Sequence, residues 1–323
     1  MALKYAQASF GADSKAATAL GLAGVKIETL HPREGDYCYV ETLGSIEAPH
    51  VLFVGVAPLS RFGYGQIRAF SAKVLEVLST EAPSTEHIGM TIHGVGYGLD
   101  EVESALAQFA GYLDALRAGR IPQGLKRITI LELDAGRVER LRSVLDENLR
   151  LSKFASPTKP QWGYRIAAPQ LLWESLTSDT HAERIENAGM SSDSEPHIFV
   201  AMPFKKETGD IYHYGIESPV HAVGMLCTRI DFDVFTGDIL QQVKSRIESA
   251  AAVVAELTEA NPNVYLEVGY AWGKGRPTIL LARDSKQLPF DVKGQRCITY
   301  DSIKDLEERL TEELKGLKFK GVI

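Results

Sequence analysis

The sequence predicts an α/β protein built from two domains. Short apolar runs of strand length alternate with amphipathic helical segments in both halves of the chain, as in sheets covered by helices. A stretch that opens with several prolines separates these halves. The length of 323 residues also exceeds what one small core requires. We therefore expect domains at residues 1–150 and 197–323, joined by a connector at residues 151–196.

In the first half, predicted strands alternate with predicted helices. Helices with apolar periodicity are expected at residues 67–78, 102–113 and 138–149. This alternation is typical of βαβ units on a mostly parallel sheet. The expected strands cover residues 25–29, 37–42, 51–56, 88–93 and 128–133.

A glycine-rich turn, HGVGYG, follows the fourth predicted strand. Glycine turns at helix starts can hold phosphates through free backbone N–H groups, and open α/β sheets bind ligands after their strands. Tight turns also need glycine for purely structural reasons, so both interpretations stay open. The candidate ligand-binding residues of this half are the strand-end residue His93 and the glycines Gly94, Gly96 and Gly98.

Residues 25–149 resemble the macro-like domain that precedes the catalytic domain in leucyl aminopeptidases, and more distantly the macro domains that bind ADP-ribose. The resemblance is carried by VLFVGVAP, IGMTIHGVGYGLDEVESAL and ITILELDAGRVERL. It implies a macro-like three-layer α/β module, and by extension a domain that senses a nucleotide-like ligand. No aminopeptidase metal cluster follows in this chain, so the resemblance does not imply peptidase activity.

The connector contains one expected helix and two large aromatic side chains. Residues 169–187 are expected to form a helix that turns Leu172, Leu176 and Ile185 inward. Trp162 and Trp173 stand in an otherwise polar stretch, so we expect them to pack onto a domain or a partner subunit.

The second half predicts a flavodoxin-like parallel sheet of five strands. Its order of elements is β-α-β-α-β-α-β-loop-β-α, which places every strand end at one edge of the sheet. Open α/β sheets bind their ligands at this carboxyl edge. The candidates there follow successive strands at residues 202–206, 231–238, 256–267 and 283–284.

The sequence AVVAELTEANPNVYLEVGYAWGKGRPTILL, at residues 252–281, contains the strongest candidate for catalysis. Asn261 is a suitable helix N-cap, Pro262 suits the first helical position, and Gly273 and Gly275 end the helix. Glu267 is the only charged residue between Ala260 and Gly273. A lone carboxylate on such an apolar helix is costly unless a function uses it, so we take Glu267 as the candidate catalytic residue.

The C-terminal half resembles the nucleoside 2-deoxyribosyltransferase-like family, which is related to the Toll/interleukin-1-receptor (TIR)-like domains that cleave NAD. FVAMPF, FTGDI, the 252–281 stretch and LPFDVKGQRCITYD carry the resemblance over residues 197–317. It implies that Glu267 is the nucleophile at the sugar C1′ and that Asp238 holds and protonates the base. Asn261 stands where the transferases carry an aspartate, and Phe199 where they often carry tyrosine.

Three functions follow from these observations. The first is a nucleotide or NAD N-glycosidase, in which a carboxylate stabilises positive charge on the sugar and the nucleotide is the substrate, with no cofactor. By analogy with TIR-like effectors, such an enzyme would serve regulated antiphage defence. The second is a non-catalytic nucleotide-binding signalling module, which Asn261 favours, and the third is a deoxyribosyltransferase. The resemblance also implies a homodimer or larger homo-oligomer.

Several residues are expected to bind the substrate because they follow strands at the carboxyl edge or match the family. Arg283 is also a candidate phosphate contact. The expected substrate-binding residues are Phe199, Met202, Pro203, Phe204, Asp231, Asn261, Asn263 and Arg283.

Composition argues against several other classes of protein. The net charge is −7 without a basic stripe, so nucleic acid is not expected as the main partner. No apolar run approaches the ~20 residues of a membrane span, and Asp13 and Lys15 interrupt the N-terminus before a signal-peptide core. The three cysteines are scattered and form no CxxC pair, so we expect no metal site and a reducing, cytoplasmic environment.

Overall fold

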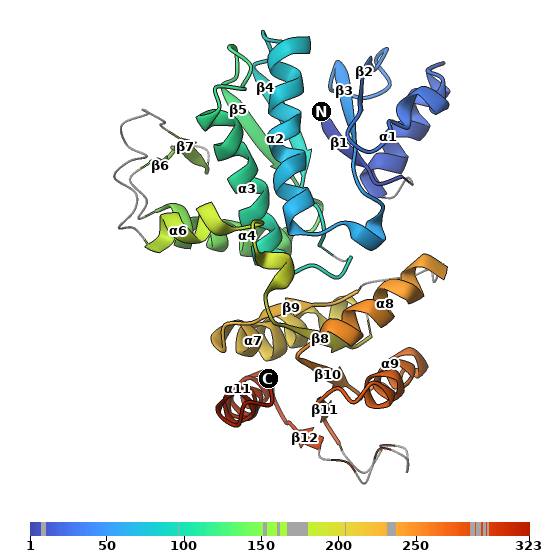
Figure 1. The fold of residues 1–323 in the computed structure, drawn as a ribbon, viewed down its shortest axis with the longest axis vertical. Coiled ribbons are helices and arrows are strands. Elements are labelled where there is room, and N and C mark those ends of the chain that lie inside the picture. The colour runs from blue at the N-terminus through green and yellow to red at the C-terminus, as the bar shows by residue number, and fades with distance from the viewer. Residues whose placement is uncertain are drawn as a thin grey trace. The chain divides into compact units, whose positions relative to one another are not determined.

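A computed structural model shows an α/β protein with two five-stranded sheets (Figure 1). The structure describes residues 1–7, 11–95, 97–150, 154–159, 162–166, 180–203, 205–230, 237–284, 288, 292, 295 and 297–323. The chain divides into two compact units. The N-terminal unit holds residues 1–94 and 101–193, and the C-terminal unit holds residues 194–323 together with the segment Val95–Asp100.

The N-terminal unit contains a mixed sheet with the strand order β2-β3-β1-β4-β5. Strand β2 runs antiparallel to β3, and the other neighbours are parallel. The strands are β1 (Ala2–Tyr5), β2 (Tyr37–Glu41), β3 (His50–Gly55), β4 (His87–Thr91) and β5 (Arg127–Leu131).

Helices cover this sheet on both faces, which gives the three layers that the resemblance implies. Because side chains alternate along a strand, Leu3 and Phe53 face α1 (Gly11–Leu22), whereas β3 also contacts α2 (Tyr64–Glu81) with its other face. Helix α3 (Glu101–Arg117) packs along α2. The remaining elements of this unit are α4 (Ala135–Leu149), α6 (Thr180–Asn187), β6 (Ala155–Pro157), β7 (Tyr164–Ile166), η1 (Ile27–Leu30), η2 (Leu59–Arg61) and η4 (Ser192–Ser194).

Strand β1, in the middle of the sheet, was not among the expected strands. The sequence prediction placed a strand at residues 25–29 instead, and this was wrong, because Ile27–Leu30 is a 3₁₀ helix that buries Leu30. Only three apolar residues precede Lys4, so the segment does not show a strand-length apolar run. The ion pair of the Lys4 ammonium with the Asp13 carboxylate, at 3.2 Å, offsets part of the cost of burying Lys4.

The connector prediction is tested only in part. Ile185 is fully buried on α6, as expected. Trp162 stays 44% exposed and lies beside the Arg142 guanidinium. Leu172, Trp173 and Leu176 lie outside the described residues.

The C-terminal unit contains an all-parallel sheet with the flavodoxin-like order β9-β8-β10-β11-β12, as predicted. Strand β10 lies at its centre, and all five of its residues are buried. The strands are β8 (His197–Ala201), β9 (Leu226–Thr228), β10 (Ala252–Glu256), β11 (Thr278–Ala282) and β12 (Cys297–Thr299).

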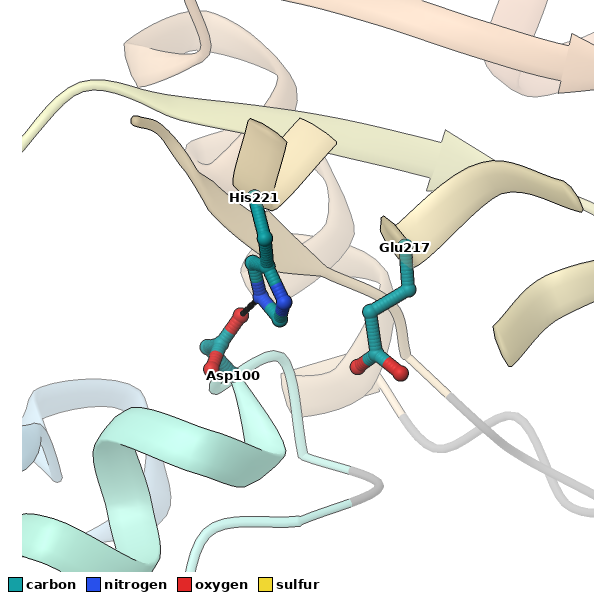
Figure 2. A group of neighbouring side chains, drawn as sticks. All are labelled: Asp100, Glu217 and His221. Carbon is teal, nitrogen blue, oxygen red and sulfur yellow. Dashed lines mark hydrogen bonds and ion pairs between the residues drawn. The ribbon is translucent and has the colours of Figure 1, made fainter. Parts of the chain in front are cut away.

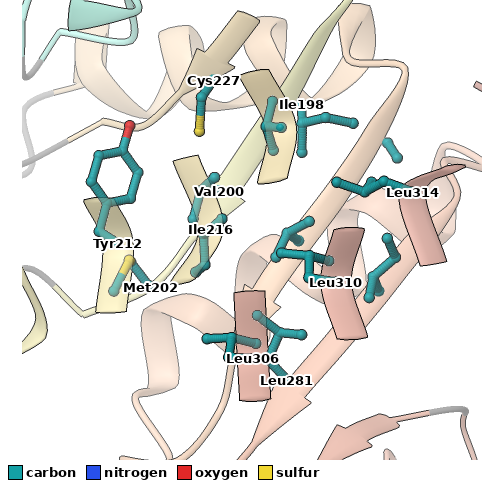
Figure 3. Packing of buried hydrophobic residues seen from close by; sticks show 14 of the residues in the cluster. Ile198, Val200, Met202, Tyr212, Ile216, Cys227, Leu281, Leu306, Leu310 and Leu314 are labelled. Atoms are coloured by element: carbon teal, nitrogen blue, oxygen red, sulfur yellow. The ribbon is translucent and has the colours of Figure 1, made fainter. Parts of the chain in front are cut away.

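Two apolar clusters lie on the opposite faces of this sheet. On one face, Ile198 and Val200 pack with Leu306, Leu310 and Leu314 (Figure 3). This face is covered by η6 (Ile211–Glu217), α7 (Ser218–Ala222) and α11 (Ile303–Phe319), and η5 (Lys206–Thr208) precedes them. The other face is covered by α8 (Gly237–Ser249) and α9 (Pro262–Gly273). Figure 1 shows these helices on both sides of the strands.

Helix α7 begins without a capping residue, although Ser218 followed by Pro219 resembles a helix N-cap in the sequence. Ser218 has helical backbone angles, φ −56° and ψ −50°, because the π-helix η6 runs directly into α7. A capping residue needs an extended backbone, so Ser218 is an interior helical residue.

None of the helices in the described residues is long and apolar enough to cross a membrane.

The close approach of α2 and α3 predicts the effect of a single methyl group. A Cβ added at Gly111 would lie 2.2 Å from the Arg68 carbonyl oxygen, whereas a Cβ at Gly316 of α11 would meet no atom within 4 Å. We expect Gly111→Ala to lower the free energy of unfolding by ~1–3 kcal/mol. Gly316→Ala should raise it by up to ~1 kcal/mol through helix propensity. Urea unfolding of the full chain measures the free energy of unfolding of both variants. A Gly111→Ala protein as stable as wild type would contradict the close packing of α2 against α3 at Gly111.

Candidate functional site

Polar groups gather where β10, β11 and β12 end. Glu256, the last residue of β10, is 2% exposed. Its Oε1 accepts hydrogen bonds from the Tyr300 hydroxyl at 3.0 Å and from the Thr258 N–H at 3.2 Å, and also from the Thr258 hydroxyl. The Thr258 hydroxyl oxygen accepts from the Arg283 N–H at 3.1 Å. The buried Glu256 carboxylate is thus the centre of a hydrogen-bond network that connects the segments after β10, β11 and β12.

This network has electrostatic consequences for Tyr300. Burial, followed by the nearby Glu256 carboxylate, raises the pKa of Tyr300 to about 12. The Arg283 guanidinium lies 5.2 Å from the centre of the Tyr300 ring. Tyr300 therefore stays a neutral hydrogen-bond donor beneath an exposed positive charge. Sequence analysis placed Glu256 and Thr258 within the candidate range 256–267 without a role of their own, and it did not identify Tyr300.

Helix α9 begins and ends as predicted. The Asn261 side-chain oxygen accepts a hydrogen bond from the Asn263 N–H at 2.9 Å, and Pro262 is the first helical residue. Gly275, with φ +66°, follows the end of the helix at Gly273. Ala260, just before the cap, has φ +50°, a conformation that favours glycine. Such strain at the end of a strand–loop segment often accompanies a functional site.

Glu267 lies in the second turn of α9 and is partly buried. Among the described residues it makes no hydrogen bond or ion pair, and burial alone raises its pKa to about 8. Residues three positions apart share one side of a helix, so Glu267 lies on the side of Tyr270. Tyr270 donates a hydrogen bond to Glu248 of α8. Glu267 is therefore a mostly protonated carboxyl at neutral pH, on the α8 side of α9.

Asp238, the expected partner of Glu267, is the second residue of α8. Helices α8 and α9 contact each other on the same face of the sheet. The Asp238 side chain lies outside the described part of the chain, as do Phe204 and Asp231. Whether the two carboxyl groups meet stays a prediction.

The remaining expected substrate contacts fall into two groups. Phe199 and Met202 are buried in the two apolar clusters, at 1% and 8% exposure. Asn263 and Arg283 are exposed at the carboxyl edge, and Pro203 lies buried just beyond the end of β8. Substrate binding by these residues stays a prediction.

The glycine-rich turn of the first half has defined partners. His93 is 3% exposed, and burial lowers its pKa well below the usual range, so its ring is neutral. Gly94 and Gly98 have φ +89° and +83°. The Gly98 N–H donates a hydrogen bond to the Arg229 carbonyl at 3.2 Å, so it is not available to bind a phosphate. Gly96 lies outside the described residues, and ligand binding by this turn stays a prediction.

The chain matches no protein-family model, and no curated protein matches it.

The raised pKa of Glu267 predicts a pH-dependent effect of Glu267→Gln on stability. The folded chain keeps this proton to about pH 8, whereas an ordinary glutamate loses it near 4.5. Between these values the folded state binds more protons than the unfolded state, so the Glu267 contribution to stability falls as pH rises. Glutamine does not titrate, so the variant should gain ~1–3 kcal/mol relative to wild type between about pH 5 and about pH 9.

Urea unfolding at several pH values measures this difference. Glu308→Gln, which changes an exposed carboxylate on α11, is the matched control and should show no such trend. A difference between Glu267→Gln and wild type that does not vary with pH would show that Glu267 titrates normally.

Proposed function

We propose that the C-terminal unit cleaves the N-glycosidic bond of a nucleotide, with NAD as the first candidate substrate and Glu267 as the catalytic carboxyl. The observation that supports this most is the environment of Glu267, which is desolvated and has no partner among the described residues. Structural carboxylates that are buried are normally hydrogen-bonded, as Glu256 is in the same unit. A buried carboxyl group without such hydrogen bonds is a candidate catalytic residue.

The chemistry needs a carboxylate beneath C1′. As the bond from C1′ to the base nitrogen breaks, its electron pair leaves with the base and positive charge develops on the sugar. The Glu267 carboxylate stabilises this charge or forms an ester bond to C1′. Water then attacks C1′; where an ester has formed, its bond to C1′ breaks and the electron pair returns to the Glu267 carboxylate. Glu267 or solvent takes the proton of the attacking water. The nicotinamide of NAD leaves without protonation because it is cationic before cleavage.

The pKa of Glu267 also fits a cationic substrate. With a pKa of about 8, roughly one tenth of the free protein carries the ionised form at neutral pH. A positively charged nicotinamide ring bound nearby would favour ionisation and lower this pKa. Binding of the correct substrate would therefore generate the reactive carboxylate.

Groups at the same edge of the sheet suit the phosphates of a nucleotide. The Arg283 guanidinium is exposed above Tyr300, and Lys205 forms an ion pair with Glu259 after the end of β8. Both would be available for charge-assisted hydrogen bonds to phosphate oxygens.

The family resemblance supports the same reaction. In the nucleoside 2-deoxyribosyltransferases that the C-terminal half resembles, the glutamate that matches Glu267 acts at C1′. The macro-like resemblance of the first half adds a nucleotide sensor, which would make the protein a regulated, cytoplasmic, homo-oligomeric effector of antiphage defence.

A non-catalytic nucleotide-binding module is the second candidate. It is favoured by Asn261, which stands where the resembling transferases carry aspartate and whose side-chain oxygen is occupied in capping α9. Such a module would bind a nucleotide without releasing its base.

Base release from a panel of NAD, ATP and deoxynucleosides tests the proposal. We expect the wild-type full chain and the Glu308→Gln control to release base from one of them, as followed by chromatography. Glu267→Gln should be at least about 100-fold slower. Equal rates in Glu267→Gln and wild type would refute the role of Glu267. Binding without any turnover would favour the signalling module, and base exchange in place of hydrolysis would favour the transferase.

The pH dependence of turnover separates the two ways in which Glu267 could act. If it acts as a carboxylate on NAD, kcat/KM should rise with pH and level off above about 8, the pKa of the free protein. If it protonates a leaving base, kcat/KM should instead fall above that value. A profile without an inflection near 8 would contradict both roles.

A further inference from the structure

A second polar cluster in the C-terminal unit lies at the outer side of β9. Its members are Asp100, Glu217 and His221, which come from the segment Val95–Asp100, the end of η6 and helix α7 (Figure 2). Each side chain offers one ligand atom, and the three atoms all lie within 4.8 Å of one another. The His221 Nε2 and the Asp100 Oδ2 are 2.6 Å apart.

The two carboxylates of this cluster are strongly buried. The Asp100 side chain is 1% exposed and that of Glu217 is 8% exposed, whereas His221 retains 31%. Asp100 Oδ2 accepts a hydrogen bond from the Cys227 N–H at 2.9 Å. Two carboxylates in one buried place repel each other and lose hydration, so they need compensation.

The hydrogen bonds of Glu217 are incomplete. One oxygen, Oε2, bonds to His213 Nδ1 at 2.7 Å. The other, Oε1, is buried and has no hydrogen-bond partner among the described residues. A buried carboxylate oxygen without a donor costs on the order of 1–3 kcal/mol or more. This second observation points to a bound group that the three side chains would share.

We propose that Asp100, Glu217 and His221 bind a divalent transition-metal ion, with zinc as the best match. One imidazole nitrogen and two carboxylate oxygens form a ligand set that suits Zn²⁺, whereas Mg²⁺ and Ca²⁺ prefer oxygen alone. Three protein ligands would leave a position open for water.

Metal binding would require the three ligand atoms, now within 4.8 Å of one another, to shift by up to about 2 Å. With metal–ligand bonds of about 2.1 Å, ligand atoms lie roughly 3.0–3.4 Å apart. The 2.6 Å contact between His221 and Asp100 would have to open by less than an ångström, and zinc would replace the proton on Nε2. His213 would act on the other oxygen of Glu217 and fix the orientation of that ligand. The π-helical turn that presents Glu217 is of a kind that occurs frequently at functional sites.

A metal here would anchor the segment Val95–Asp100 to the C-terminal sheet. This segment lies beside the residues that follow β9, where the Gly98 N–H donates to the Arg229 carbonyl and Tyr97 forms a β-bridge with Ile230. Asp100 ends the segment, so its metal bond would connect this edge with η6 and α7.

Equilibrium dialysis of the full chain against Zn²⁺ tests the site. We expect one tightly held zinc ion per wild-type chain, and at least tenfold weaker binding by Glu217→Gln and by His221→Ala. Glu308→Gln, an exposed carboxylate change elsewhere in the unit, should bind as wild type. Binding that is equal in all four proteins, or no stoichiometric zinc in wild type, would overturn the proposal.

A measurement on wild type alone covers the case in which a variant does not fold. Diethyl pyrocarbonate modifies accessible histidines, and mass spectrometry locates the modified residues. Zinc should protect His221 at least tenfold and leave the exposed His87 of β4 unprotected. Modification of His221 that is equal with and without zinc would contradict metal binding at this position.

Discussion

The parallel pairing of β10 with β8 and β11 is the constraint on which the C-terminal unit depends. Residues 252–256 are buried on both faces and hydrogen-bond to both neighbouring strands. A central parallel strand must be covered by helices on both sides, so each connection returns over a face of the sheet. The segments that leave the strands therefore meet at one edge. This is why Glu256, Thr258 and Arg283 can form one network.

Two glutamates close in sequence have different surroundings. Glu256 is fully enclosed, but Tyr300 and Thr258 donate hydrogen bonds that stabilise it. Glu267 is less enclosed and receives no hydrogen bond from the described residues, so its neutral form is favoured. The first arrangement stabilises the sheet edge. The second keeps a carboxyl at a neutral-range pKa, where a small change in its surroundings changes its charge.

The sequence was sufficient for elements whose signal is local. The apolar runs of β8, β10 and β11 predicted the parallel sheet, and Asn261, Pro262 and Gly275 predicted the bounds of α9. Strand β1 was missed because Lys4 breaks its short apolar run, and the partner that makes its burial tolerable lies on another element. The π-helical turn before Ser218 was also missed, because no residue pattern marks it.

The polar clusters lie beyond sequence reasoning for a different reason. Asp100 and His221 are 121 positions apart, and Glu256 and Tyr300 are 44 apart. Such pairs form only when the sheet has assembled, so the spacing of these residues in the sequence does not predict their contact. The expectation that the chain has no metal site depended on the absence of metal ligands close together in the sequence. That criterion does not detect a site whose ligands come from distant segments.

The most direct test of the proposed role of Glu267 is its own titration. Carbon-13 NMR of protein labelled at the glutamate carboxyl carbons, over about pH 4 to about pH 10, would follow each carboxyl. The Glu267 signal is identified by its loss in Glu267→Gln. A midpoint near 8 would establish a desolvated carboxyl poised for chemistry. A midpoint near the ordinary value of 4.5 would show a hydrated surface glutamate and remove the main support for N-glycosidic cleavage.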